Sequence, residues 1–372
     1  MNIELCIREK EISVECYVEV DSRMYEFALA SNWRVKEFMN NGEKVENIKQ
    51  EKCVMQFRPA MTKYTVEGLE KGTLVIRYSG LPQGNFSFLT DKFIHFSFYN
   101  GWYPTGFDVV EKYTAVIDVS DEYRVLKGTY DESTKLWTYT ASEKGNIDCN
   151  IICFNSEKTH MLESDNVNVY WFDDDKTELS TGMFTEYAKV CDYYCSLYGN
   201  NKLEHTDIVF VPGDYQMGAY MRDGLIVFTE MSMDMDDMMH VLGHEIGHAY
   251  ANGADVDTYN DWLNETHAEW SALLYAAEKK PDFFTEMMER YEKEILGTDN
   301  KLNLRECGDR RPDNVHVTGT AIYFEIYKRF GADAVAELLR IFDRLEKKNT
   351  DAFIEKVSEH NQDVAGIIRS HL

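Results

Sequence analysis

No stretch of the 372-residue chain approaches the roughly 18 uncharged apolar residues that a membrane-spanning helix needs. Residues 1–8 contain no apolar signal core and lead almost directly into a strand-like pattern. These two absences predict a cytoplasmic protein that has no membrane partner.

Positive charge is scarce, because 39 lysine and arginine residues face 65 acidic residues and leave a formal net charge of −26. A surface with this balance repels phosphate backbones and anionic lipid headgroups. We therefore expect neither nucleic acid nor an anionic membrane as a partner.

The eight cysteines contain no CxxC pair. The closest pairs are Cys149 with Cys153 and Cys191 with Cys195, and three intervening residues are not the spacing of zinc knuckles or redox motifs. We expect reduced, mostly buried thiols.

Residues 1–157 have the pattern of a β domain. Apolar and polar residues alternate strictly from Ile12 to Val20, which is the period of a half-buried strand. Further strand-like runs occupy residues 53–58, 73–78, 113–119 and 135–139, and turn formers such as Asn41-Gly42 separate them. The pattern predicts a sandwich or saddle of eight or more strands.

Residues 158–372 have mostly helical patterns of apolar residues, with a few short strand-like runs. Helical patterns cover residues 181–198 and 234–251, and short buried strands are expected at 207–212 and 224–229. Helical patterns then dominate to the last residue, without an internal repeat or a low-complexity linker. This half of the chain predicts a second, α+β domain.

The segment His244-Glu245-Ile246-Gly247-His248 lies within the second predicted helix. On a helix His244 and His248 stand one turn apart on the same face, so both imidazoles can reach one metal ion. Glu245 points to one side, where its carboxylate can take a proton from water at the metal. Such a motif also arises by chance on helices, so a third ligand is needed to support a catalytic zinc site.

The third ligand distinguishes two kinds of HExxH site. A metzincin site needs a glycine and a third histidine soon after the motif, but both corresponding positions are alanine. A gluzincin site needs a glutamate on a following helix, and Glu265 supplies it after 16 intervening residues. We therefore predict a zinc ion (Zn²⁺) that is held by His244, His248 and Glu265.

Two neighbours of Glu265 have different expected roles. Glu269 lies one helical turn further on the same face, where it can accept a hydrogen bond from a ligand imidazole and orient the ring. A solvated helix charge is the alternative for Glu269. His267 points away from that face and is expected to be structural or exposed.

These motifs together resemble the aminopeptidase-N-like gluzincin family, whose signature is HExxH, a spacer and W-L-N-E, here Trp262-Leu263-Asn264-Glu265. Residues 218–226 are similar to the family's G-A-M-E-N-W-G-L-I, and residues 102–108 to its F-P-C-F-D segment. The resemblance implies an N-terminal β saddle, 1–157, followed by a thermolysin-like α+β catalytic domain, 158–372. It also implies that the family's large C-terminal helical domain is missing.

The resemblance further implies a peptide substrate and a substrate-binding segment that comprises Gly218, Ala219, Tyr220 and Met221. The glutamate with which the family pairs the substrate's amino terminus is replaced here by Met221, and the adjacent Arg222 would repel an ammonium group. A buried unpaired charge costs on the order of several kcal/mol. A standard aminopeptidase is therefore not expected, although Asp223 and Glu230 stay open as other acidic anchors.

The family's oxyanion-binding tyrosine, in a Y-x-x-G pattern, corresponds here to the histidine of His316-Val317-Thr318-Gly319. A histidine can also donate to a tetrahedral oxyanion, and a well-placed donor contributes about 2.7–4 kcal/mol. Tyr323, two helical turns further on, is the alternative donor. The spacer before Glu265 is two residues shorter than the family's usual one, which a loop can absorb.

The predicted activity is zinc-dependent hydrolysis of peptide bonds with Glu245 as the general base. An endopeptidase, a carboxypeptidase-like enzyme or a narrower peptidase is favoured. The alternative is a weak or inactive member of the same fold that binds peptides as a scaffold, but a scaffold has no use for Glu245. Hydrolysis of a non-peptide amide or epoxide, and the oligomeric state, stay open.

Overall fold

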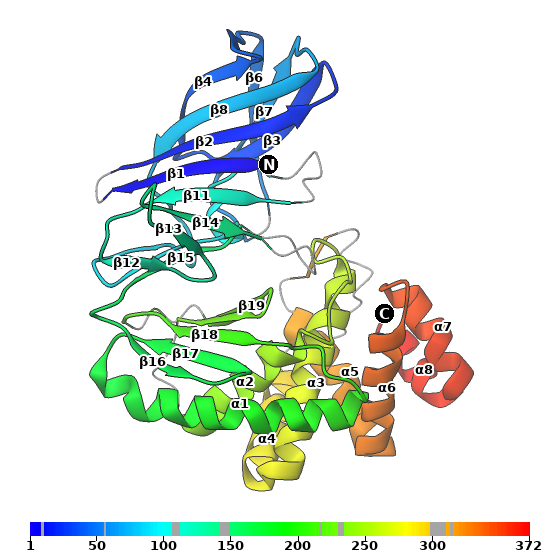
Figure 1. The fold of residues 1–372 in the computed structure, drawn as a ribbon. Helices are drawn as coiled ribbons and strands as arrows, with labels where there is room; N and C mark the ends of the chain where they lie inside the picture. The colour runs from blue at the N-terminus through cyan, green and yellow to red at the C-terminus, as the bar shows by residue number, and fades with distance from the viewer. Residues whose placement is uncertain are drawn as a thin grey trace. The chain divides into compact units, whose positions relative to one another are not determined.

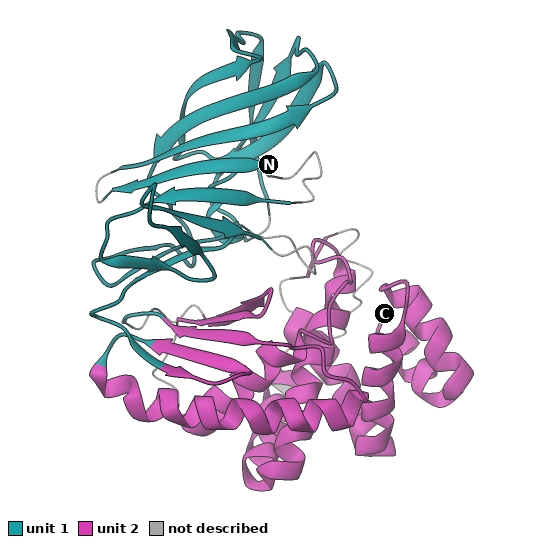
Figure 2. Ribbon diagram, in the orientation of Figure 1, with its two compact units in different colours: residues 1–161, 171–173, 211–217 teal, residues 162–170, 174–210, 218–372 magenta. Residues whose placement is uncertain are grey.

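The computed structural model describes residues 1–8, 11–55, 57–105, 112–141, 149–213, 215, 218–229, 234–297, 310–312 and 315–372. The chain divides into two compact units (Figure 2). Unit 1 comprises residues 1–161, 171–173 and 211–217, and unit 2 comprises residues 162–170, 174–210 and 218–372. Each unit contains sheets of its own.

The described part of unit 1 contains three sheets and the short 3₁₀ helix η1 (Phe98–Asn100) (Figure 1). The eight-stranded sheet has the order β13 (Thr129–Asp131), β14 (Leu136–Thr140), β11 (Thr114–Asp118), β1 (Asn2–Arg8), β2 (Glu11–Val20), β8 (Gly72–Gly80), β4 (Arg34–Asn40), β5 (Glu43–Lys44). The four-stranded sheet has the order β12 (Tyr123–Val125), β15 (Ile151–Asn155), β10 (Phe93–Phe96), β9 (Phe88–Leu89). The three-stranded sheet has the order β3 (Met24–Ala30), β7 (Met61–Glu67), β6 (Ile48–Cys53).

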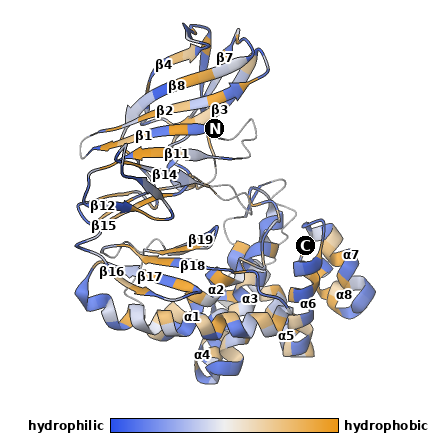
Figure 3. Ribbon diagram, viewed as in Figure 1, coloured by the Kyte–Doolittle hydropathy of each residue, from blue (hydrophilic) through white to orange (hydrophobic). Residues whose placement is uncertain are grey.

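The alternation along β2 builds the core of unit 1. Its five apolar residues from Ile12 to Val20 are all buried, whereas the residues between them are exposed or half-buried. Burying a valine or isoleucine side chain contributes about 1.5–3 kcal/mol, so the register in which β2 pairs with β8 is strongly preferred. Figure 3 shows hydrophobic and hydrophilic residues along the strands of this sheet. The predicted strand is confirmed.

The turn formers Asn41 and Gly42 make the expected turn in unit 1. Asn41 and Gly42 join β4 to β5 with φ values of 51° and 88°, as a two-residue type I′ hairpin turn requires.

The prediction of a strand at 53–58 is wrong. β6 ends at Cys53, and Phe57 has a φ of 61°, which lies outside the region that strands occupy.

The described part of unit 2 contains a five-stranded sheet, eight α-helices and the 3₁₀ helices η2 (Asp174–Lys176) and η3 (Tyr259–Asp261). The sheet has the order β16 (His160–Glu163), β17 (Val167–Trp171), β18 (Thr206–Phe210), β20 (Leu225–Phe228), β19 (Ala219–Arg222). The helices are α1 (Thr177–Tyr198), α2 (Met235–Gly247), α3 (Trp262–Lys279), α4 (Pro281–Gly297), α5 (Val315–Phe330), α6 (Ala332–Arg344), α7 (Thr350–His360) and α8 (Gln362–Ser370).

The sheet and helices of unit 2 form an α+β arrangement. β17, β18 and β20 are parallel, and β19 pairs antiparallel with β20 at the edge. Every residue of β18 is buried, and the strand is paired on both sides, with β17 and β20. The predicted fold class, β sheets followed by an α+β unit, is confirmed. Among the described helices, none is both long enough and apolar enough to cross a bilayer.

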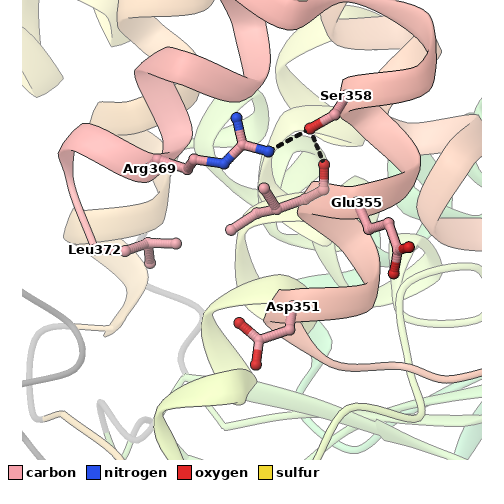
Figure 4. Close-up of a pocket in the computed structure, with 6 residues that line it drawn as sticks. Asp351, Glu355, Ser358, Arg369 and Leu372 are labelled. Carbon is pink, nitrogen blue, oxygen red and sulfur yellow. Dashed lines mark hydrogen bonds between the residues drawn. The ribbon is translucent and has the colours of Figure 1, made fainter.

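A cavity of about 550 Å³ lies at α7 and α8 and is lined by Asp351, Ile354, Glu355, Ser358, Arg369 and Leu372 (Figure 4). Arg369 crosses it and donates a 2.6 Å hydrogen bond to the hydroxyl of Ser358. The predicted site residues lie elsewhere in unit 2, on or directly next to β19, α2, α3 and α5.

Candidate metal centre

Helix α2 holds the two histidines of the HExxH motif. It begins at Met235, and the preceding Asp234 caps it by accepting hydrogen bonds from the backbone N–H groups of Asp236 and Asp237 at 3.0 and 2.9 Å. It ends at Gly247, but His248 keeps helical dihedrals, with φ −62° and ψ −17°. The Nε2 atoms of His244 and His248 lie 3.2 Å apart. One helical turn therefore brings both imidazoles to one point, as the spacing predicts.

Glycines let α2 approach α3 closely. A Cβ on Gly247 would lie 3.0 Å from the Cα and the carbonyl oxygen of Ala268, and a Cβ on Gly243 would lie 3.2 Å from the Cβ of Ala272. Real Cβ atoms rarely come this near to backbone, so these positions need glycine or a shift of the helix. The glycine of the HExxH segment thus sets the distance between the histidines and Glu265.

Glu265 completes a triangle of metal-ligating atoms. Its Oε2 lies 3.5 Å from His244 Nε2 and 3.7 Å from His248 Nε2. Ligands held about 2.0–2.1 Å from a tetrahedral zinc are about 3.3–3.4 Å from one another. Oε2 is buried and accepts no hydrogen bond from the described residues. The spacing, the orphaned oxygen and the His₂Glu donor set all fit zinc.

Glu269 orients His244 through the ring nitrogen that does not face the triangle. Its Oε2 accepts a hydrogen bond from Nδ1 of His244 at 2.8 Å, and its Oε1 accepts one from Nε2 of His240 at 2.7 Å and another from the hydroxyl of Tyr291. A proton on Nδ1 leaves the lone pair of His244 Nε2 directed at the triangle. The sequence predicts this place for Glu269; it does not identify His240 or Tyr291.

Neighbouring imidazoles favour the ionised form of Glu269. Burial raises the pKa of Glu269, but the imidazoles of His240 and His244 outweigh burial and hold that pKa well below its usual range. Burial likewise lowers the pKa of His244, but Glu265 and Glu269 raise it well above 6.5. This concentration of negative charge favours a cation at the centre of the triangle.

Arg311 is a site residue that the sequence analysis missed. Its guanidinium donates through Nε to Asp261 Oδ2 at 2.5 Å and through Nη2 to Glu265 Oε1 at 3.4 Å, and only 8% of its side chain is exposed. The ion pair holds Oε1 away from the triangle and leaves Oε2 directed towards it. No local pattern could reveal Arg311, because it lies 46 residues beyond Glu265.

His316 lies beside the triangle, at the start of α5. Its Nδ1 is 3.2 Å from Glu265 Oε2, and 57% of its side chain is exposed. Partial burial lowers its pKa, although the charge of Glu265 opposes the shift. The position of His316 depends on the close packing of α5 against α3 at Gly319. An added Cβ at Gly319 would lie 1.5 Å from the hydroxyl of Thr266 on α3. The histidine and glycine of the H-V-T-G segment therefore dock together next to Glu265.

Tyr323 lies away from the triangle. Its side chain is fully buried, and its hydroxyl is hydrogen-bonded to Nε2 of His267 at 2.9 Å. His267 is buried as well and contacts the carbonyl of Leu263 through Nδ1, in agreement with the predicted structural role. The hydroxyl of Tyr323 is thus already hydrogen-bonded within the core, which argues against this residue as the alternative oxyanion donor.

The predicted substrate segment forms the edge of the sheet. Ala219, Tyr220 and Met221 belong to β19, and Gly218 precedes it with a φ of 75°. Tyr220 and Met221 are buried at 4% and 8% exposure. Asp223 lies in the turn to β20 with a φ of 49°. Glu230 and residues 106–108 of the F-P-C-F-D-like segment lie outside the described residues.

No protein-family model and no curated protein sequence matches this chain. Solved structures do match it. Native yeast LTA4 hydrolase superposes with a TM-score of 0.69 at 13% identity, over 100% of this chain and 66% of the yeast chain. The M1 zinc metallopeptidase of Deinococcus radiodurans superposes with a TM-score of 0.67 at 15% identity, over 100% of this chain and 92% of that one.

The chain has the fold of the M1 zinc metallopeptidases. This chain spans about two thirds of the length of the yeast enzyme and nearly all of the Deinococcus M1 enzyme. A mutant of the Deinococcus M1 enzyme has been solved with a Tyr-Ser-Ala substrate, and it matches this chain with a TM-score of 0.66 at 14% identity. At these identities the likeness concerns the fold.

Proposed function

We propose that this chain is a zinc-dependent peptidase of the gluzincin type, with residues 158–372 as its catalytic domain. The observation that carries the proposal is the triangle of His244 Nε2, His248 Nε2 and Glu265 Oε2, whose edges measure 3.2, 3.5 and 3.7 Å. The M1 fold supports the same reading, because those relatives are zinc metallopeptidases.

Glu245 is the proposed general base. Zinc, when bound, supplies Lewis-acid chemistry that polarises the scissile carbonyl and lowers the pKa of water. Glu245 follows His244 on α2 and is only 6% exposed, so little bulk water surrounds its side chain. These features support a role for its carboxylate beside the metal. It takes the proton of the attacking water and returns it to the leaving amine.

The peptide is proposed to bind along β19. This strand ends the order of the described strands of its sheet, and an extended peptide adds to such an edge through main-chain hydrogen bonds. Gly218, Ala219, Tyr220 and Met221 would line it. Because Met221 provides no carboxylate, the substrate's ammonium group has no anchor at that position, and a standard aminopeptidase is disfavoured.

His316 is the proposed donor to the developing oxyanion. It borders the triangle through its contact with Glu265, whereas the hydroxyl of Tyr323 is bonded to His267. A donor at that place stabilises the transition state more than the ground state, which is what accelerates the reaction.

Substitution Glu245→Gln tests the proposal. The amide keeps the shape of the side chain but cannot accept the proton, so kcat/KM on a fluorogenic peptide library should fall about 10²–10⁴-fold. Zinc content should stay unchanged, and Glu289→Gln, at an exposed glutamate of α4, should keep full activity. Unchanged peptide hydrolysis in Glu245→Gln rules out this base.

Two measurements separate the alternatives. Zinc bound by the wild-type chain without any peptide turnover would identify a peptide-binding scaffold instead of an enzyme. Mass spectrometry of the products from a peptide mixture locates the cleaved bond relative to the termini. Release of single N-terminal residues would show an aminopeptidase that uses another acidic anchor.

A further inference from the structure

The contact between His316 and Glu265 has an unusual geometry. Nδ1 of His316 lies 3.2 Å from Glu265 Oε2, yet Oε2 accepts no hydrogen bond from any described residue. The two atoms are within ion-pair distance but do not form a hydrogen bond, and the same spacing is found between two ligand atoms of one zinc ion.

The distances suit a fourth ligand. Ligand atoms of His244, Glu265 and His316 all lie within 4.8 Å of one another. The fourth corner of a tetrahedral zinc site lies about 3.3–3.4 Å from each of the other ligand atoms. Nδ1 of His316 is 3.2 Å from Oε2, which is close to the spacing of two ligand atoms on one zinc ion.

Backbone packing holds His316 in this place. Gly319 lies one turn further along α5, and an added Cβ there would overlap the hydroxyl of Thr266, the residue after Glu265. The close approach of α5 to α3 therefore positions the start of α5 against Glu265. His316 reaches the triangle because of this docking, and a flexible loop is not required.

We propose that His316 is a displaceable fourth protein ligand of the zinc ion and closes the resting site through Nδ1. The inference rests on the proposed zinc site. Water or substrate would replace Nδ1 at the metal, and the released ring would then donate to the oxyanion. The exposed fractions of the side chains agree with this order: 14% for His244, 22% for His248 and 14% for Glu265, but 57% for His316. Only His316 has room to rotate into solvent.

The test counts imidazoles at the metal. X-ray absorption of the zinc-loaded protein should show three imidazole ligands in the wild type and two in His316→Ala. His316→Phe keeps the bulk of the ring and should also show two. His205→Ala removes a half-buried histidine that is distant in sequence from the motif, and it should keep three.

Two further readouts do not depend on activity. The cobalt-loaded wild type and His316→Ala should differ in visible absorption, since coordination changes. Zinc affinity, measured by chelator competition, should fall at least about tenfold in both His316 variants, as loss of even an outer contact costs 10–100-fold. Addition of a non-hydrolysed peptide to the wild type should lower its imidazole count to two.

The outcomes separate this inference from the proposed function. Two imidazoles in the zinc-loaded wild type, with unchanged cobalt absorption and zinc affinity in His316→Ala, overturn the fourth ligand and leave the His₂Glu peptidase in place. Three imidazoles in a wild type that hydrolyses no peptide support the ligand and overturn the peptidase. A wild type that binds no zinc overturns both.

Discussion

The two carboxylate oxygens of Glu265 face different partners. Oε1 lies 3.4 Å from Arg311, while Oε2 lies 3.2–3.7 Å from nitrogens of three histidines. A cation on one oxygen thereby orients the other towards the metal position. Glu269 does the same for His244 through a 2.8 Å hydrogen bond. Both positioning contacts are buried, and single substitutions there should change stability as well as metal binding.

Glu269 should make the metal-free protein sensitive to acid. Its pKa is held well below the 4.5 of the unfolded chain, so its contribution to stability is present above about pH 4.5 and is lost as the pH falls towards the folded pKa. Between pH 7 and pH 3.5, the free energy of unfolding from urea titration should fall more steeply in the wild type than in Glu269→Gln.

The exposed Glu289 of α4 provides the matched control. Glu289→Gln should follow the wild-type curve, whereas the difference between the wild type and Glu269→Gln should shrink below about pH 4.5. A difference that stays constant through that range would show that Glu269 acts by packing and not by its charge.

At the scale of elements, α2, α3 and α5 meet at glycines. Gly247 admits the backbone of Ala268, and Gly319 admits the hydroxyl of Thr266. Helix interiors disfavour glycine by about 1 kcal/mol relative to alanine, so close packing has to compensate for this cost. These approaches bring residues of three helices to the metal centre.

Gly319→Ala should destabilise the protein and weaken zinc binding. The added methyl group would sit 1.5 Å from the hydroxyl of Thr266, so α5 has to move, and overpacking of this kind costs about 1–3 kcal/mol or more. Gly366→Ala on α8 is the control, because nothing lies within 4 Å of its added methyl group. That variant should gain up to about 1 kcal/mol of stability, as measured by urea unfolding.

Local patterns predicted these elements well where one period dominated. The alternation along β2 and the helical spacing of His244, Glu245 and His248 are properties of neighbouring residues, so the sequence shows them directly. The strand predicted at 53–58 failed because apolar residues there belong to a turn in which Phe57 has a φ of 61°. Composition alone does not distinguish such a turn from a strand end.

For the whole molecule, the described candidate ligands all lie in unit 2. A ligand that binds only the folded state adds RT ln(1 + [L]/Kd), about 4.1 kcal/mol at a thousandfold excess over Kd. Zinc removal by a chelator should therefore lower the melting temperature in calorimetry, and added zinc should restore it. The variant His244→Ala should melt at the same temperature with and without chelator. An equal shift in that variant would place the metal elsewhere.

The sequence by itself determined that His244 and His248 lie on one face of a helix, because helical periodicity places residues one turn apart on one face. It also predicted Glu245 as the general base and Glu265 as the third ligand. Resemblance pointed to His316 as well. Only the tertiary structure decided that His316 borders Glu265, that Tyr323 is hydrogen-bonded to His267, and that Arg311 is paired with Glu265. These contacts join segments about 50 residues apart, and close packing of α3 against α5 creates the contacts of His316 and Tyr323. No local pattern records such packing.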